Sequence, residues 1–293
     1  MRIARFTHAG RTGLGAVVDD AVVDLQAGTP SRSPDLLVHL DAGDLGLDRL
    51  RQALADAPAT ARIALDEVRL EAPIPRPPVV YALALNYAAH QDETGQERPE
   101  FLKVFTKSPS CIVGPVDAIE VPRASSMVDY EGELGVVIGR RCRHVPADRA
   151  LEVVAGYLIV NDVSVRDWQR RSPTMILGKS WDTHGPTGPW LTTADEVADP
   201  QDLAIRTTVS GEVLQDGTTA DMLWSIAEQI ETLSTVTTLE PGTIISTGTP
   251  AGVGAARTPP RFLVPGDEVV VEIEGLGRLA NPVVAEPEPE PFR

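Results

Sequence analysis

The stretch Asp129-Tyr130-Glu131-Gly132-Glu133 runs directly into the apolar segment Leu134-Gly135-Val136-Val137-Ile138-Gly139. Successive side chains of a strand point to opposite faces, so Glu131 and Glu133 are predicted to share one face at the head of a buried strand. Two carboxylates beside an apolar core repel each other unless a cation compensates them. Oxygen ligands at this spacing suit Mg²⁺, Mn²⁺ or Ca²⁺. A solvated strand face is the alternative interpretation of the same pattern.

A second buried-strand pattern supplies a third candidate ligand. The run Gly156-Tyr157-Leu158-Ile159-Val160-Asn161 is followed at once by Asp162. If the two strands end side by side, Asp162 would meet Glu131 and Glu133. The sequence therefore predicts a site for a hard cation made of these three carboxylates.

Composition describes a globular chain. Its 293 residues suffice for one large domain or for a large and a small one, and no apolar run is long enough to span a bilayer. The N-terminus lacks an apolar signal core, which predicts a cytoplasmic location. Cys111 and Cys142 are isolated, so neither a disulfide framework nor a zinc site is expected. A net charge of −16 argues against nucleic-acid and membrane partners, and an anionic substrate would need a local positive centre.

Turn and proline patterns divide the chain into four parts. Residues 1–72 combine short strand patterns with leucines at helical spacing and form a predicted small N-terminal α/β domain. Residues 73–78 are a proline-rich linker, and the Glu/Pro tail at 285–293 is expected to be disordered. Residues 79–284 carry many short strand patterns and few helices, which predicts a mainly β (α+β) fold, a sandwich or rolled sheet. The helices expected there lie at 147–153 and 220–233, with 163–170 as a further candidate.

A histidine and a glutamate follow a strand-like run near residue 80. His90 and Glu93 are three residues apart, so on a helical turn the carboxylate can hydrogen-bond to the imidazole and raise its basicity. Such a dyad can act as a general base on water. Gly95 and Pro99 flank the segment, which suggests a lid over the substrate. A solvated helix start is the alternative interpretation.

Further segments offer groups for an anionic substrate. If a short helix begins after Asp162, Arg166 and Gln169 lie on one face, although Arg166 could equally form a structural pair with Asp167. Lys179 stands in an irregular loop framed by Gly and Pro, where it could orient an oxyanion or simply be exposed. The small-residue turn at 246–254 offers hydroxyl and backbone N–H groups to an anion but lacks the spacing of a nucleotide-binding loop.

Taken in order, these segments resemble the fumarylacetoacetate hydrolase (FAH) family over nearly all of residues 79–282. Five motifs carry the resemblance: N-Y-x-x-H-x-x-E, D-Y-E-x-E-L, N-D-V-S-x-R-D-x-Q, G-K-S-x-D-T and S-T-G-T-P-x-G-V-G. The N-terminal unit also looks like the small leading domain of many members. The family fold is a β-rich roll of mixed sheets, usually in a homodimer, and both properties are expected of this chain.

The resemblance also implies roles for individual residues. Glu131, Glu133 and Asp162 match the ligands of a divalent metal, normally Mg²⁺ or Mn²⁺. The remaining positions match a water-activating dyad on a lid, a lysine that assists at the substrate and the metal, two residues beside it, and a threonine that contacts the substrate carboxylate. His90 and Glu93 match the dyad, and Lys179 matches the lysine. Arg166 and Gln169 match the two residues beside it, and Thr249 matches the threonine.

Departures from the family pattern narrow the expected substrate. Ala84, Trp181 and His184 replace residue types that are common in the family, and Leu83 stands where members acting on fumarylacetoacetate carry a further metal-binding aspartate. This favours the branch with acylpyruvate hydrolases, oxaloacetate decarboxylases and isomerases of catechol-degradation products. The expected activity is metal-dependent hydrolysis of a C–C bond in a 2,4-dioxo acid, an acylpyruvate or a fumarylpyruvate-like compound, through an enolate. An oxaloacetate-type decarboxylase, a 2-hydroxydiene-dioate isomerase and a catalytically silent binding protein are the alternatives.

Overall fold

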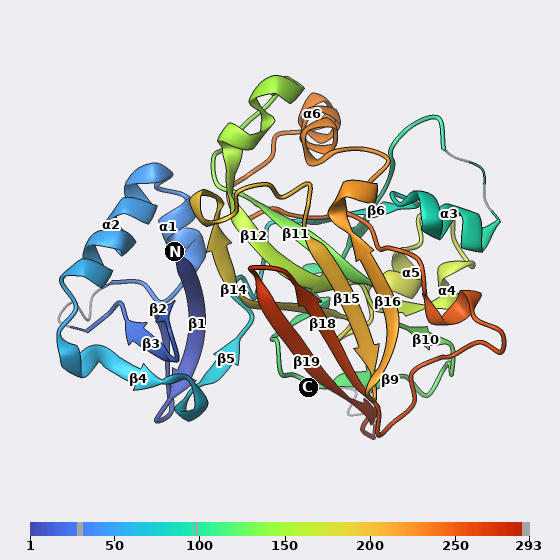
Figure 1. The fold of residues 1–293 in the computed structure, drawn as a ribbon, viewed down its shortest axis with the longest axis horizontal. Helices are drawn as coiled ribbons and strands as arrows, with labels where there is room; N and C mark the ends of the chain where they lie inside the picture. The colour runs from blue at the N-terminus through green and yellow to red at the C-terminus, as the bar shows by residue number, and fades with distance from the viewer. Residues whose placement is uncertain (28–31, 96, 98, 289–293) are drawn as a thin grey trace.

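Two large sheets, one two-stranded ladder and a few short helices make up the fold of the described residues (Figure 1). A computed structural model describes residues 1–27, 32–95, 97 and 99–288. The final part of the predicted disordered tail, 289–293, lies outside the described residues. No helix in the described ranges is both long enough and apolar enough to cross a membrane.

The larger sheet spans both predicted domains. Its strands in the described residues are β1 (Arg2–His8), β2 (Arg11–Val18), β3 (Ala21–Asp24), β4 (Arg62–Ala64), β5 (Arg69–Glu71), β6 (Val80–Ala84), β7 (Lys103–Lys107), β8 (Ile112–Val113), β11 (Gly132–Ile138), β12 (Val154–Asn161), β14 (Gly185–Thr193) and β17 (Ile244–Ser246). Their order is β4-β3-β2-β1-β14-β12-β11-β17-β6-β7, with β5 paired to β1 and β8 to β14. Most neighbours are antiparallel, whereas β6 and β17 are parallel, so the sheet is mixed.

A second sheet packs on the C-terminal part of the first. It has the order β16 (Glu212–Thr218), β15 (Ala204–Val209), β18 (Glu268–Ile273), β19 (Gly277–Ala285) and β9 (Ile119–Val121). A short ladder joins β10 (Val128–Asp129) to β13 (Ser164–Val165). The predicted mainly β roll of mixed sheets is therefore confirmed.

The helices are short and lie at the ends and edges of the sheets. They are α1 (Leu36–Leu40), α2 (Asp44–Ala55), α3 (Ala88–Thr94), α4 (Arg166–Gln169), α5 (Ile176–Lys179) and α6 (Ile226–Val236). 3₁₀ helices form at η1 (Ala59–Ala61), η2 (Leu65–Glu67), η3 (Pro109–Cys111), η4 (Ala147–Val153), η5 (Ala194–Glu196), η6 (Thr219–Asp221) and η7 (Gly254–Ala256).

The predicted helices of the second domain form with shifted bounds. The helix expected at 220–233 begins only at Ile226, because Ser225 and Glu228 form a capping box there. The segment 147–153 is a 3₁₀ helix rather than an α-helix. The candidate at 163–170 begins as strand β13 and becomes helical only at Arg166.

Strand β11 is buried on both faces. Leu134, Val136 and Ile138 belong to the core shared with the second sheet, whereas Val137 belongs to a core shared with the N-terminal leucines Leu36 and Leu50. Because both faces are covered, the strand reads as a continuous apolar run rather than an alternating one. This double burial encloses the two glutamates at its start.

The N-terminal unit continues the larger sheet. Strand β1 pairs antiparallel with β14 through Ile3 and Leu191, and the terminal ammonium of Met1 lies 2.8 Å from Glu196 Oε1. Residues 73–78 form neither helix nor strand. The first tail residues are held in place, because Glu286 accepts a 2.8 Å hydrogen bond from the backbone N–H of Arg123.

Candidate metal centre and active site

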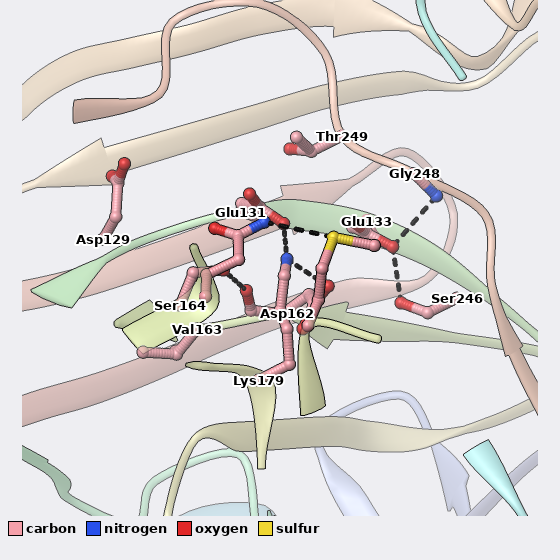
Figure 2. A network of polar contacts seen from close by, with 12 residues as sticks. Asp129, Glu131, Glu133, Asp162, Val163, Ser164, Lys179, Ser246, Gly248 and Thr249 are labelled. Carbon is pink, nitrogen blue, oxygen red and sulfur yellow. Dashed lines mark hydrogen bonds and ion pairs between the residues drawn. The ribbon is translucent and has the colours of Figure 1, made fainter. Parts of the chain in front are cut away.

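The three predicted carboxylates converge where β11 and β12 meet. In this antiparallel pair Gly132 lies opposite Asn161, and the N–H of Asp162 donates to the carbonyl of Glu131 at 2.9 Å. Glu131, Glu133 and Asp162 are all buried, and one carboxylate oxygen from each lies within 4.8 Å of the others (Figure 2). The alternative of a solvated strand face is therefore wrong.

Lys179 and Arg166 bind different members of this triad. Lys179 Nζ lies 2.6 Å from Glu131 Oε2 and 2.7 Å from Asp162 Oδ2, and Arg166 Nη1 lies 2.6 Å from Glu131 Oε1. Burial alone would raise the pKa of Glu131, but Lys179 and Arg166 hold it well below the ordinary value. Lys179 is buried, so the alternative of an exposed lysine without a role is wrong.

Glu133 differs from Glu131 and Asp162 because neither Lys179 nor Arg166 forms an ion pair with it. Burial, followed by the charges of Asp162 and Glu131, raises the pKa of Glu133 well above its ordinary value. Its Oε2 accepts hydrogen bonds from Ser246 Oγ at 2.5 Å and from the N–H of Gly248 at 2.9 Å, as Figure 2 shows. Gly248 has φ of +97°, a conformation that favours glycine. No ion pair with Glu133 forms among the described residues, so the oxygen-rich donor set fits a divalent cation.

A second lysine, which the sequence reasoning did not identify, forms an ion pair with Asp162. Lys107 at the end of β7 is buried, and its Nζ lies 2.6 Å from Asp162 Oδ1 and also donates to the carbonyl of Lys179. The one available signal was its spacing of two from the apolar Phe105, which places both side chains on the inner face of β7.

Asp129 also went unassigned in the sequence, although it opens the decisive motif. Its carboxylate accepts hydrogen bonds from the N–H groups of Gly254 at 2.7 Å and Ala255 at 2.9 Å, and from Arg166 Nε at 2.8 Å. It therefore fixes both the start of η7 and the guanidinium of Arg166.

The dyad forms as the spacing predicts. His90 Nδ1 lies 2.6 Å from Glu93 Oε1 on α3, and the N–H of Gly252 donates to Glu93 Oε2 at 2.9 Å. His90 is 8% exposed, so a solvated helix start does not describe it. His90 also helps to lower the pKa of Glu131, which places the imidazole near the triad.

The alternative partner proposed for Arg166 is wrong. The Arg166 guanidinium binds Asp129 and Glu131, whereas Asp167 accepts from Ser125 Oγ at 2.6 Å. Adjacent residues of a helix do not face each other, which explains why Arg166 and Asp167 separate. Arg166 Nη1 also donates to Gln169 Oε1 at 3.1 Å, while Nη2 is buried without a hydrogen-bond partner in the described residues.

A cavity of about 580 Å³ opens over the triad, within the range usual for small-molecule sites. All the predicted site residues line it except Asp162, which lies outside the lining. Thr249 Oγ1 donates to the carbonyl of Gly132 at 2.9 Å and accepts from Gln215 Nε2 at 2.8 Å. The predicted contact of Thr249 with a substrate carboxylate would require this hydroxyl to change partners.

The residues that depart from the family pattern fall into two groups. Leu83 and Ala84 line the cavity and shape its wall. Trp181 packs edge-on against Trp168, with ring centroids 5.1 Å apart, and His184 is fully buried outside the cavity lining. Only the first group can contact a ligand in the cavity.

Two family matches cover almost the whole chain. Residues 79–284 match the family described as "Fumarylacetoacetate (FAA) hydrolase C-terminal", and residues 1–73 match "Rv2993c-like, N-terminal". The chain therefore belongs to the fumarylacetoacetate hydrolase family, as its five motifs predicted.

Relatives within this family have several activities. The chain is 44% identical over 275 residues to oxaloacetate tautomerase FAHD2A, mitochondrial, of Bos taurus, covering 93% of this chain and 87% of the relative. Maleylpyruvate hydrolase from Sphingobium sp. SYK-6, solved with manganese(II) and pyruvate, superposes with a TM-score of 0.82 at 34% identity, over 98% of this chain and 100% of that one. A probable 2-hydroxyhepta-2,4-diene-1,7-dioate isomerase from Mycobacterium abscessus superposes with a TM-score of 0.81 at 34% identity and the same coverage. The chain is thus an FAH-family enzyme with an acidic triad suited to a divalent metal.

Proposed function

We propose that the protein is a divalent-metal-dependent hydrolase that cleaves a C–C bond in a 2,4-dioxo acid, an acylpyruvate or a fumarylpyruvate-like compound. The observation that carries this proposal is one cavity lined both by carboxylates of the buried triad and by the His90–Glu93 dyad. Mg²⁺ or Mn²⁺ held by Glu131, Glu133 and Asp162 would supply Lewis-acid stabilisation of the negative charge that develops on a 2-oxo acid. The manganese and pyruvate in the related maleylpyruvate hydrolase support this choice.

The dyad provides the general base for hydrolysis. His90 Nδ1 donates its hydrogen to Glu93, so Nε2 is the nitrogen that accepts a proton from water. Glu93 is itself oriented by the N–H of Gly252, which keeps the imidazole in one orientation. Attack of this water on the distal carbonyl breaks the C–C bond and leaves an enolate, which takes up a proton to give the 2-oxo acid product.

The cationic residues bind and orient the substrate. Arg166 retains an unpaired Nη2 donor, which we assign to the substrate carboxylate. Lys179, held between Glu131 and Asp162, reduces the repulsion that these carboxylates exert on an incoming anion. Gln169 Nε2, whose contact with Met175 Sδ is 3.6 Å, is the second donor that we assign to a developing oxyanion.

A second reaction has specific support. The 44% identity to a bovine oxaloacetate tautomerase favours enol–keto conversion or decarboxylation of oxaloacetate on the same site. An isomerase of 2-hydroxydiene-dioates would use the same residues. Decarboxylation needs only departure of CO₂ from the bound acid, and tautomerisation or isomerisation needs only proton transfer. None of these reactions uses an attacking water, so the products separate them from hydrolysis.

The test supplies the Mn²⁺-loaded protein with acetylpyruvate, fumarylpyruvate, oxaloacetate and 2-hydroxyhepta-2,4-diene-1,7-dioate in parallel. Hydrolysis would release pyruvate and a second acid in equal amounts from the first two. Glu131→Ala should lose both metal and turnover, while His90→Ala should keep the metal and lose hydrolysis by about 10²–10⁴-fold. His8→Ala, on β1 and outside the cavity lining, is the matched control. Turnover of oxaloacetate alone would refute the hydrolase assignment, and hydrolysis by His90→Ala at the parent rate would refute the role of His90.

We also propose that two copies of the chain associate as a homodimer and that the small-molecule partner is a keto acid. The proposed location is the cytoplasm. The homodimer follows the usual state of the family. Sedimentation of the purified protein tests the first proposal, and cell fractionation tests the second.

A further inference from the structure

The cavity contains more positive charge than the triad requires. Besides Arg166 and Lys179, which are bonded to carboxylates of the site, Lys103, Arg170 and Arg257 line it. These three cations form no ion pair with any residue in the described ranges. The chain has 42 acidic and only 26 basic residues, so unpaired cations gathered around one cavity call for a ligand that matches them.

Arg257 is the best-positioned of the three. It follows η7, and its Nη2 donates to the carbonyl of Leu214 at 2.8 Å. The guanidinium also lies beside the hydroxyl of Tyr130, and its Nε is buried without a partner in the described residues. The side chain is therefore held in place while part of its donor capacity is unused. A guanidinium with spare N–H donors that lines the cavity can form a charge-assisted hydrogen bond with a carboxylate.

Lys103 and Arg170 add charge at the solvent side. Lys103 begins β7 opposite Ala84 of β6, and Arg170 directly follows α4; both side chains are exposed. Long-range attraction of an anion to such groups falls with salt, whereas a desolvated contact with Arg257 falls less. Leu83, Leu85 and Val253 provide apolar wall in the same cavity for a short carbon chain.

We propose that Arg257, Lys103 and Arg170 form a second anion subsite that binds the distal carboxylate of a dicarboxylic 2-oxo acid. The enzyme would then prefer dianionic 2-oxo acids to singly charged ones of the same length. The proposal rests on the proposed function for the 2-oxo acid end, which the triad and Arg166 bind. It deepens that function by naming the charge of the substrate tail and the residues that select it.

The experiment measures binding rather than turnover. Dissociation constants of two matched pairs are determined by calorimetry with the Mn²⁺-loaded protein: 2-oxoglutarate with 2-oxopentanoate, and 2-oxoadipate with 2-oxohexanoate. Each pair differs in the distal carboxylate. We expect the dianion to bind about tenfold or more tightly in at least one pair, as a charged hydrogen bond allows. Arg257→Gln should remove most of this preference and leave the monoanion unaffected.

Two further variants keep the test decisive. The double variant Lys103→Met/Arg170→Met changes only exposed side chains, and should reduce the preference at low salt but much less at high salt. Arg171→Gln is the control, because Arg171 stacks on Trp168 at 3.6 Å and does not line the cavity. It should leave the preference unchanged.

The outcomes separate this proposal from the proposed function. Equal affinity for both members of both pairs overturns the subsite, as does an Arg257→Gln variant that weakens both acids equally. If Arg257→Gln does not fold, an unchanged preference in the double variant at low salt overturns it instead. Preference for the dianion without C–C cleavage would refute the proposed hydrolysis and support the anion subsite. Cleavage without this preference would refute the subsite and support the hydrolysis.

Discussion

Replacing Lys107 with methionine should strongly destabilise the protein in the absence of metal. The change leaves the buried carboxylate of Asp162 with Lys179 as its one remaining cationic contact among the described residues and removes the donor to the Lys179 carbonyl. Across 2.6 Å, the attraction between Lys107 and Asp162 is about 6 kcal/mol at an effective dielectric constant of 20. Part of this is offset because the lysine no longer has to be desolvated. The net loss expected for breaking a buried pair is about 3–5 kcal/mol.

The measurement is urea unfolding followed by tryptophan fluorescence, with a chelator present in all samples. Lys103→Met is a matched control on the same strand, because Lys103 is exposed and should cost no more than about 0.5 kcal/mol. In an Asp162→Asn background, Lys107→Met should cost less than half as much, since the pair no longer exists. A loss below about 1 kcal/mol in the parent background would refute the view that Lys107 stabilises the triad.

Two other changes follow from buried groups. The Nε2 of His184 donates to the Glu120 carbonyl at 2.9 Å, Nδ1 has no partner in the described residues, and burial lowers the His184 pKa to about 4. As the pH falls, the unfolded chain therefore binds a proton that the folded chain excludes. The free energy of unfolding should fall by up to about 3 kcal/mol between pH 6.5 and pH 4 because of this group, and His184→Gln should lack this contribution. Equal pH dependence of the unfolding free energy in the parent and the variant, measured by urea titration, would contradict it. Glu133→Gln keeps an oxygen acceptor for Ser246 and Gly248 but removes a charge that burial opposes, so the metal-free protein should be at least as stable while retained Mn²⁺ disappears. Metal analysis after gel filtration tests this, with Glu152→Gln on the surface as the control, and full Mn²⁺ retention would contradict it.

The acidic triad was predictable because it needs only side-chain alternation in one strand and the pairing of two strands with clear apolar patterns. Alternation places Glu131 and Glu133 on one face, and pairing of β11 with β12 brings Asp162 beside them. The His90–Glu93 contact was predictable for the same reason, since it depends only on helical spacing within one turn.

Lys107 and the partners of Arg166 could not be predicted in this way. Lys107 reaches Asp162 because β6 and β7 pair at the sheet edge and fold toward a residue that is 55 positions later in the chain. A lysine on an edge strand usually points to solvent, so local sequence gives the wrong expectation. Arg166 faced a similar choice between Asp167, its neighbour in sequence, and Asp129, which is 37 positions earlier and is brought close by the β10–β13 ladder.

The hydrogen bond from the Asp162 N–H to the Glu131 carbonyl joins the two segments that carry the triad through the main chain. The cavity mouth, in contrast, is built from side chains at the ends of β6, α4 and η7. Substitutions at the mouth can therefore change which acids are accepted without displacing the carboxylates beneath. A laboratory that wished to redirect this catalyst toward bulkier or uncharged tails would randomise Leu83, Ala84 and Arg257 and leave the two central strands untouched.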